Sequence, residues 1–204
     1  MLGAVKVGSD SLDSIINAMC EKYTVEPALA KAIIRQESNW DVNASRYEAH
    51  LNDSSWGLMQ VLLKTARGVL NRPTLTIAEL VTPEVNIEAG VKFIGQLLQR
   101  YNYTYDDAIA AYNAGSARRG KDGKYVNQSY VDGVNRWYNM YIAIGTVSNA
   151  ASKVTDSIAN AFSFSFTAPT EQSASQRDET DMTPFLVGGG ALVAMLLVVG
   201  ASKR

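Results

Sequence analysis

Residues 27–39 read PALAKAIIRQESN, and this stretch puts an acidic residue on the apolar face of a helix. Pro27 suits the first position of a helix, because its missing N–H would have no partner there. The apolar residues that follow recur at helical spacing: Leu29, Ile33 and Ile34. Glu37 comes four residues after Ile33 and therefore shares their face. We expect burial to raise the pKa of Glu37, and the nearby C-terminal end of the helix dipole to act in the same direction.

Glu37 is therefore the first candidate for a catalytic residue. A carboxylic acid that is still protonated near neutral pH can act as a general acid in the cleavage of a glycosidic bond. The alternative is a structural glutamate that pairs with a nearby arginine, Arg35 or Arg46. The periodicity of the helix leaves both interpretations open.

Apolar periodicity predicts further helices on both sides of this stretch, so that residues 11–144 are mainly α. One begins near Ser11, and a third begins at Thr82-Pro83. The buried face of this third helix is predicted to consist of Ile87, Val91, Ile94, Leu97 and Leu98. A shorter helix covers residues 106–112, and a final one carries Tyr130, Val134, Trp137 and Tyr141. Residues 39–55 are polar and aperiodic, which indicates a loop or short irregular strands.

The composition excludes several classes of function. The chain has 204 residues with 19 basic and 20 acidic side chains, and this balance disfavours a nucleic-acid partner. Its single cysteine, Cys20, excludes an internal disulfide framework and a thiolate metal cluster. With one histidine, His50, and no Gly-x-Ser-x-Gly or His-Glu-x-x-His motif, serine-hydrolase and zinc-hydrolase chemistry are poor interpretations.

The C-terminal end differs from the rest of the chain. Residues 185–201 contain no charged side chain, and this length approaches that of a membrane-spanning helix. The acidic residues of the segment before it and the basic pair after it, Lys203 and Arg204, favour a C-terminus on the inner side of a membrane. We expect a folded domain at residues 1–145, a partly helical Ser/Thr-rich linker at 146–183 and a transmembrane anchor at 184–204.

Several short motifs occur in one order along the folded part of the chain. They are Glu37-Ser38-Asn39, Gly57-Leu58-Met59-Gln60, Asn86-Ile87 with Gly90, Ala111-Tyr112-Asn113-Ala114-Gly115, and Tyr130-Val131 with Val134. In this order and approximate spacing they resemble the soluble lytic transglycosylase (SLT) domain family. The resemblance covers residues 25–141 approximately.

This resemblance implies a lysozyme-like, mainly α domain with minimal β structure near residues 48–58, whose lobes flank a groove. It implies that Glu37 is the sole catalytic acid, with Ser38 orienting its carboxyl group. The residues that it assigns to substrate are Ser38, Met59, Gln60, Tyr112, Asn113 and Tyr130. The family cleaves the β-1,4 bond between N-acetylmuramic acid and N-acetylglucosamine in peptidoglycan and leaves a 1,6-anhydro ring. Neither a metal nor an organic cofactor is implied.

The chain also departs from the family pattern. It has Leu63 and Val42 where the family often has proline, and the segment 46–53 is longer than usual. Glu48 or Asp53 in that segment is a candidate second carboxylate, which would favour a lysozyme-type hydrolase on the same scaffold. A third interpretation is a non-catalytic membrane protein of a virion that docks on the cell wall.

The termini suggest how the domain reaches its substrate. The N-terminus, MLGAVK, lacks the apolar core of a signal peptide, whereas the C-terminus carries the predicted anchor. This combination resembles virion proteins of membrane-containing bacteriophages, in which a transglycosylase opens the wall during genome entry. The expected location is the internal membrane of such a virion. The alternative is a bacterial inner membrane with the domain facing the periplasm.

Overall fold

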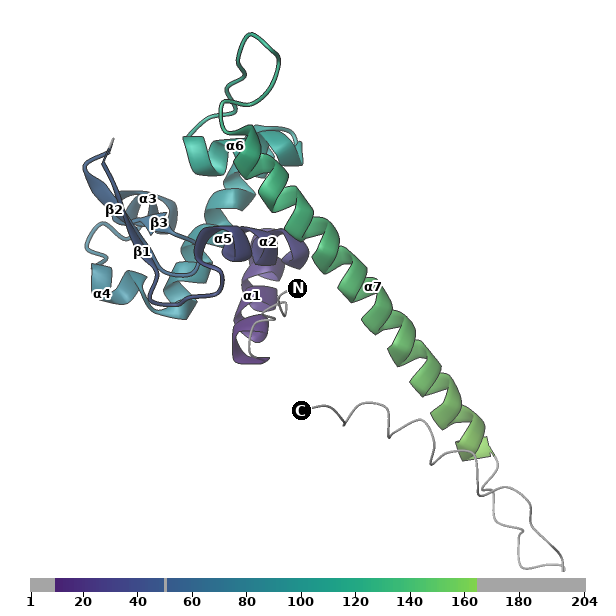
Figure 1. The fold of residues 1–204 in the computed structure, drawn as a ribbon. Coiled ribbons are helices and arrows are strands. Elements are labelled where there is room, and N and C mark those ends of the chain that lie inside the picture. Colours follow the sequence, from purple (N-terminus) through teal and green to yellow (C-terminus); the bar gives the residue numbers. More distant parts are fainter. Residues whose placement is uncertain (1–9, 50, 165–204) are drawn as a thin grey trace, which may run out of the picture. The chain divides into compact units, whose positions relative to one another are not determined.

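The computed structural model describes residues 10–49 and 51–164 (Figure 1). Its helices are α1 (Asp10–Tyr23), α2 (Pro27–Ser38), α3 (Leu63–Leu70), α4 (Ile77–Leu80), α5 (Pro83–Arg100), α6 (Tyr105–Ala114) and α7 (Gln128–Phe164). The strands are β1 (Ser45–Glu48), β2 (Asp53–Trp56) and β3 (Val61–Leu62). The described part is thus mainly helical with one small sheet, as the sequence predicted.

Helix α5 is the centre of the core, and it packs against α1, α3, α4, α6 and β3. Its predicted inner face is confirmed, because the side chains of Ile87, Val91, Ile94, Leu97 and Leu98 are all at most 2% exposed. The inner face of α2 is buried as completely, with Leu29, Ile33 and Ile34 at 0%. Pro27 occupies the first turn of α2, and Asn39 ends this helix in the left-handed conformation.

The three strands form an antiparallel sheet in the order β1-β2-β3. In the β1–β2 pairing, Arg46 lies opposite Ser55 and Glu48 lies opposite Asp53. The strand β1 and most of β2 lie within the polar, aperiodic segment 39–55, and β3 follows after it. Arg46 and Glu48 are two residues apart on β1, so their side chains project from the same face of the sheet.

Asn86 ties the sheet to α5 through its buried side-chain amide. Its Oδ1 accepts a hydrogen bond from the Met59 backbone N–H at 2.8 Å, and its Nδ2 donates to the carbonyls of Trp56 and Leu80 at 2.8 and 3.1 Å. Gly57 allows this approach, because a Cβ atom at residue 57 would lie 2.5 Å from Asn86 Nδ2. The amide therefore fixes the turn between β2 and β3 without leaving a buried polar atom unpaired.

Helix α7 includes the predicted final helix and continues to Phe164. The boundary between the two compact units of the chain, residues 1–155 and 156–204, falls within this helix. The predicted division at residue 145 stays a prediction. No helix among residues 10–49 and 51–164 has both the length and the apolar character needed to cross a membrane. The predicted anchor at 184–204 lies outside the described residues.

Candidate active site

A cleft of about 590 Å³ opens between α2, the sheet and α6. Its lining combines acidic, basic, amide and aromatic side chains with an apolar wall. The residues that line it are Glu37, Arg46, Glu48, Leu51, Ser55, Gln60, Val61, Leu62, Thr65, Phe93, Tyr112, Asn113, Ala114, Gly115 and Arg118.

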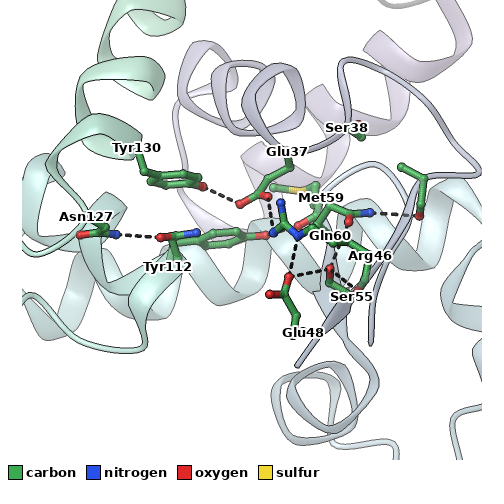
Figure 2. A network of polar contacts seen from close by, with 12 residues as sticks. Glu37, Ser38, Arg46, Glu48, Ser55, Met59, Gln60, Tyr112, Asn127 and Tyr130 are labelled. Carbon is green, nitrogen blue, oxygen red and sulfur yellow. Dashed lines mark hydrogen bonds and ion pairs between the residues drawn. The ribbon is translucent and has the colours of Figure 1, made fainter. Parts of the chain in front are cut away.

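Glu37 lies in the last turn of α2, and only 5% of its side chain is exposed. The Tyr130 hydroxyl on α7 donates a hydrogen bond of 2.7 Å to Glu37 Oε1 (Figure 2). The other carboxyl oxygen, Oε2, lies 3.9 Å from Nη2 of Arg46. Arg35, the other arginine proposed as a partner, instead bonds Asn39 and stacks on Trp137.

The environment of Glu37 favours the protonated carboxylic acid. Burial raises the pKa of Glu37 to about 7, and the charge of Glu48 acts in the same direction. The hydrogen bond from Tyr130 and the charge of Arg46 lower the pKa in part. The predicted rise through burial is confirmed. At neutral pH, Glu37 is therefore present in both protonation states, which suits a group that first donates and then accepts a proton.

Two tyrosines, Tyr112 and Tyr130, approach Glu37 from α6 and α7. Burial, and next the negative charge of Glu37, hold the pKa of both hydroxyls well above the ordinary value, so both stay neutral hydrogen-bond donors. Tyr112 donates to the Met59 carbonyl at 2.9 Å, and its ring lies 5.2 Å from that of Phe93 between centroids. These contacts fix an aromatic wall beside the carboxyl group.

Gln60 contributes an amide whose orientation is fixed by the turn before β3. Its backbone is left-handed, with φ at 46°, and its Nε2 donates to the carbonyls of Ala44 and Gly57 at 3.0 and 2.8 Å. The Ser55 hydroxyl lies 3.0 Å from the side-chain oxygen of Gln60. Both polar atoms of the amide thus have partners within the protein, and Gln60 presents a rigid polar surface to the cleft.

Asn113 lines the cleft beyond Tyr112, and Asn127 supports it from outside. Asn127 Nδ2 donates to Asn113 Oδ1 and to the Ala110 carbonyl, both at 3.0 Å. The structure therefore brings Glu37, Gln60, Tyr112 and Asn113 together around one cleft, and Tyr130 reaches the same carboxyl group from α7.

Ser38 and Met59 do not have the positions that the sequence suggested. The Ser38 hydroxyl donates to the Ile34 carbonyl at 3.1 Å, and its side chain lies apart from the Glu37 carboxyl (Figure 2). A serine on a helix often bonds the carbonyl four residues earlier in this way. The Met59 side chain is 0% exposed and packs against Gly90, where a Cβ atom would come within 2.3 Å of its sulfur. Met59 instead contributes its carbonyl, which holds Tyr112.

The two candidate second carboxylates differ in position. Glu48 lines the cleft, where its Oε1 forms an ion pair of 2.7 Å with Arg46 Nε. Asp53 lies outside the cleft lining, and its Oδ1 accepts from the Ser54 backbone N–H. Ser55 and Asn127 belong to the site although the sequence does not indicate them, and Arg46 is predicted from the sequence only as a structural partner of Glu37. No sequence motif marked these three residues.

Comparison with known proteins gives a family match and a fold match. The family model described as the transglycosylase SLT domain matches residues 14–132, which is more than half of the chain. Among solved structures, an inactive mutant of the lytic transglycosylase Slt from Pseudomonas aeruginosa matches with a TM-score of 0.52 and 22% identity, over 67% of this chain and 24% of that protein. The 70-kDa soluble lytic transglycosylase in complex with bulgecin A matches with a TM-score of 0.52 and 22% identity, over 64% and 24%. The chain thus spans about a quarter of the length of either protein.

Proposed function

The chain belongs to the transglycosylase SLT domain family, and on this premise we propose that it is a peptidoglycan lytic transglycosylase with Glu37 as its acid and base. The observation that carries the proposal is the environment of Glu37. This carboxyl group is 5% exposed, has a pKa of about 7 and opens into a cleft of about 590 Å³. A buried acid of this kind matches the demands of glycosidic bond cleavage.

The reaction needs one carboxyl group that acts twice. Protonated Glu37 donates its proton to the glycosidic oxygen, the bond from that oxygen to C1 of N-acetylmuramic acid breaks, and the bonding electrons leave with N-acetylglucosamine. The sugar cation or its N-acetyl-assisted equivalent is then attacked at C1 by its own C6 hydroxyl oxygen. The C6 hydroxyl proton returns to the Glu37 carboxylate. The products are a 1,6-anhydro ring and a free hydroxyl group, and no water is consumed.

The other cleft residues suit an amino-sugar polymer. Phe93, Tyr112 and Leu51 offer apolar surface for the faces of sugar rings, and Asn113 offers an amide for hydroxyl and N-acetyl groups. Gln60 uses both amide hydrogens within the protein, but its side-chain oxygen can accept a second hydrogen bond from a sugar hydroxyl. Tyr130 acts differently, because its hydroxyl bonds the catalytic carboxyl directly. It stabilises the carboxylate that exists between the two proton transfers.

A lysozyme-type hydrolase is the second candidate, and the position of Glu48 favours it. Glu48 lines the same cleft as Glu37, so it is the one proposed second carboxylate with access to substrate there. In a hydrolase this group would activate a water molecule. The contacts of Glu48 argue against this role, because its carboxylate is already paired with Arg46 and lies 3.3 Å from the Ser55 hydroxyl.

The experiment that tests the proposed activity is the release of soluble muropeptides from purified peptidoglycan by the full-length protein. The Glu37→Gln variant keeps the shape of the side chain and removes its proton, so we expect at least a hundredfold loss of release. Glu84→Gln is the matched control, because Glu84 is an exposed glutamate on α5 outside the cleft. Equal loss in both variants would contradict the role of Glu37. Full release by Glu37→Gln would likewise contradict the role of Glu37 as acid and base, whereas no release by the wild-type protein would favour a protein that docks on the wall without catalysis.

The proposed place of action is the surface of a membrane. The apolar segment 185–201 supports an anchor, and the domain would then open the wall locally during phage genome entry from a virion's internal membrane. A bacterial inner membrane with the domain in the periplasm is the alternative location. Flotation of the full-length protein with lipid vesicles tests the anchor. We expect the protein in the lipid fraction, and recovery of all protein in the lipid-free fraction would contradict the anchor.

A further inference from the structure

The guanidinium group of Arg46 lies between two carboxyl groups of the cleft, at unequal distances. Its Nε is 2.7 Å from Glu48 Oε1, and its Nη2 is 3.9 Å from Glu37 Oε2 (Figure 2). The first contact is a hydrogen-bonded ion pair, whereas the second is too long for a hydrogen bond. Arg46 is therefore bound to Glu48 and is close to Glu37 without being bound to it.

The sheet explains why Arg46 stays there. Arg46 and Glu48 project from one face of β1, and their partner strand brings the hydroxyl of Ser55 beside them. Ser55 is 3% exposed, and its Oγ lies 3.3 Å from Glu48 Oε1 and 3.0 Å from Gln60 Oε1. The single Ser55 hydroxyl hydrogen is within reach of both oxygens, so Glu48, at 20% side-chain exposure, contacts the β2 strand on one side and binds Arg46 on the other.

From this geometry we propose that Arg46 is a positioning residue, and that Glu48 fixes its distance from Glu37. At this distance Arg46 stabilises the Glu37 carboxylate that exists between the two proton transfers. Arg46 is nevertheless too far away to prevent Glu37 from being protonated before the reaction starts. The proposal rests on the proposed function of Glu37 as acid and base. It assigns Glu48 to the control of Arg46 rather than to the activation of water.

The physical reason lies in the two states through which Glu37 must pass. A hydrogen-bonded ion pair between Arg46 and Glu37 would strongly favour the carboxylate, and the acid would have no proton to give at neutral pH. Without any cation, the buried carboxylate left after proton donation would be costly. The Arg46 guanidinium lies 3.9 Å from Glu37 Oε2, and Glu48 partly neutralises its charge. Its effect on the Glu37 carboxylate is therefore intermediate between that of a hydrogen-bonded ion pair and that of no cation.

The charged and titratable groups that act on Glu37 come from three elements. Arg46 on β1 lowers the pKa of Glu37, Glu48 on the same strand raises it, and the hydrogen bond from Tyr130 on α7 lowers it. Tyr112 on α6 stays neutral, since its own pKa is well above the ordinary value. Changes at Arg46 and Glu48 should therefore shift the pKa of Glu37 in opposite directions.

The direct test is the pKa of Glu37, measured by carbon NMR of side-chain carboxyl groups in the full-length protein. In Arg46→Gln we expect the pKa of Glu37 to rise by about 0.5, and in Arg46→Lys to rise less because a positive charge remains. In Glu48→Gln we expect it to fall by a similar amount, since the introduced amide keeps an acceptor for Arg46 but carries no negative charge. Lys64→Gln removes an exposed positive charge on α3 and should leave the value unchanged.

Glu48→Ala separates positioning from charge. It removes the same negative charge as Glu48→Gln but offers no acceptor to Arg46, so the guanidinium loses its fixed place. We expect the pKa of Glu37 in Glu48→Ala to lie below that in Glu48→Gln, because the released guanidinium can then form an ion pair with the Glu37 carboxylate. Equal values in these two variants would overturn the positioning role of Glu48, and an unchanged value in Arg46→Gln would overturn that of Arg46.

Kinetics on peptidoglycan supply the second readout. The alkaline limb of kcat/KM should move to higher pH in Arg46→Gln and to lower pH in Glu48→Gln, because the general acid must be protonated in the free enzyme. A hundredfold loss in Glu48→Gln at every pH would assign Glu48 to the chemistry and overturn the proposal. Absence of any cleavage by the wild-type protein would contradict the proposed function, whereas the NMR values would still test the position of Arg46.

Discussion

The hydroxyl of Tyr130 donates a 2.7 Å hydrogen bond to Glu37 Oε1 from a helix 93 residues away in sequence. This contact joins the last turn of α2 to the first turn of α7. Because the Tyr130 hydroxyl stays protonated, it favours the carboxylate form of Glu37, whereas burial favours the acid form. The pKa of about 7 is the balance of these opposing effects.

The Tyr130→Phe variant removes the hydroxyl and keeps the ring. We expect the pKa of Glu37 to rise and the alkaline limb of kcat/KM to move to higher pH, since the carboxylate loses its hydrogen bond. At neutral pH we expect kcat/KM to fall about tenfold, because the carboxylate formed in the reaction is less stable. Tyr47→Phe is the matched control, since Tyr47 is 62% exposed and outside the cleft lining. A pH profile identical to the wild type would contradict this role of Tyr130.

Burial of Glu37 should also make the stability of the protein depend on pH. The pKa of Glu37 is about 7 in the folded protein against an ordinary value of 4.5. Between these values the folded state keeps a proton that the unfolded state has lost, so this group destabilises the fold progressively as pH rises from 4.5 to 7. The effect is absent below pH 4.5 and complete above pH 7.

Glu37→Gln removes this cost, because the amide does not ionise. At pH 8 we expect the variant to be more stable than the wild type by about 3 kcal/mol, and the difference to shrink as pH falls toward 4.5. Denaturation by urea at several pH values measures it. A difference that does not change with pH would show that the carboxyl group ionises as easily in the folded protein as in the unfolded chain.

Asn86 should be essential for the stability of the cleft rather than for its chemistry. Asn86→Ala leaves the Met59 N–H and two carbonyls without their partner, and we expect a loss of about 2–4 kcal/mol in the free energy of unfolding. Gln96→Ala on the exposed face of the same helix is the control, with an expected change within about 0.5 kcal/mol. Equal losses in the two variants would mean that the amide does not hold the β2–β3 turn.

The sequence predicts the parts of the site that depend on local periodicity. Leu29, Ile33 and Glu37 share a face because helical geometry is regular, and burial of that face follows. The helices α3 and α4 were not predicted, since α3 buries a single residue, Ala66, and the four residues of α4 are too few to show an amphipathic period. Ser38 follows Glu37 in sequence, but on a helix the next residue points about 100° away, and adjacency gives no contact.

The positions of the remaining site residues depend on strand register, which cannot be inferred from the sequence pattern. Arg46 and Ser55 become partners because β1 and β2 pair in one register, and a shift of one residue between the strands would place their side chains on opposite faces of the sheet. Met59 belongs to the motif Gly57-Leu58-Met59-Gln60, but this motif does not indicate that the Met59 side chain is buried. It also does not indicate that the Met59 carbonyl accepts the hydrogen bond from Tyr112.

Cleavage by Glu37 should consume no water, and digestion of peptidoglycan in water labelled with heavy oxygen tests this most directly. We expect mass spectrometry to find 1,6-anhydro muropeptides without the label, and we expect Glu37→Gln to abolish them. Reducing-end muropeptides that carry one heavy oxygen each would contradict the account, because they would show that water, and not the C6 hydroxyl, attacks the sugar.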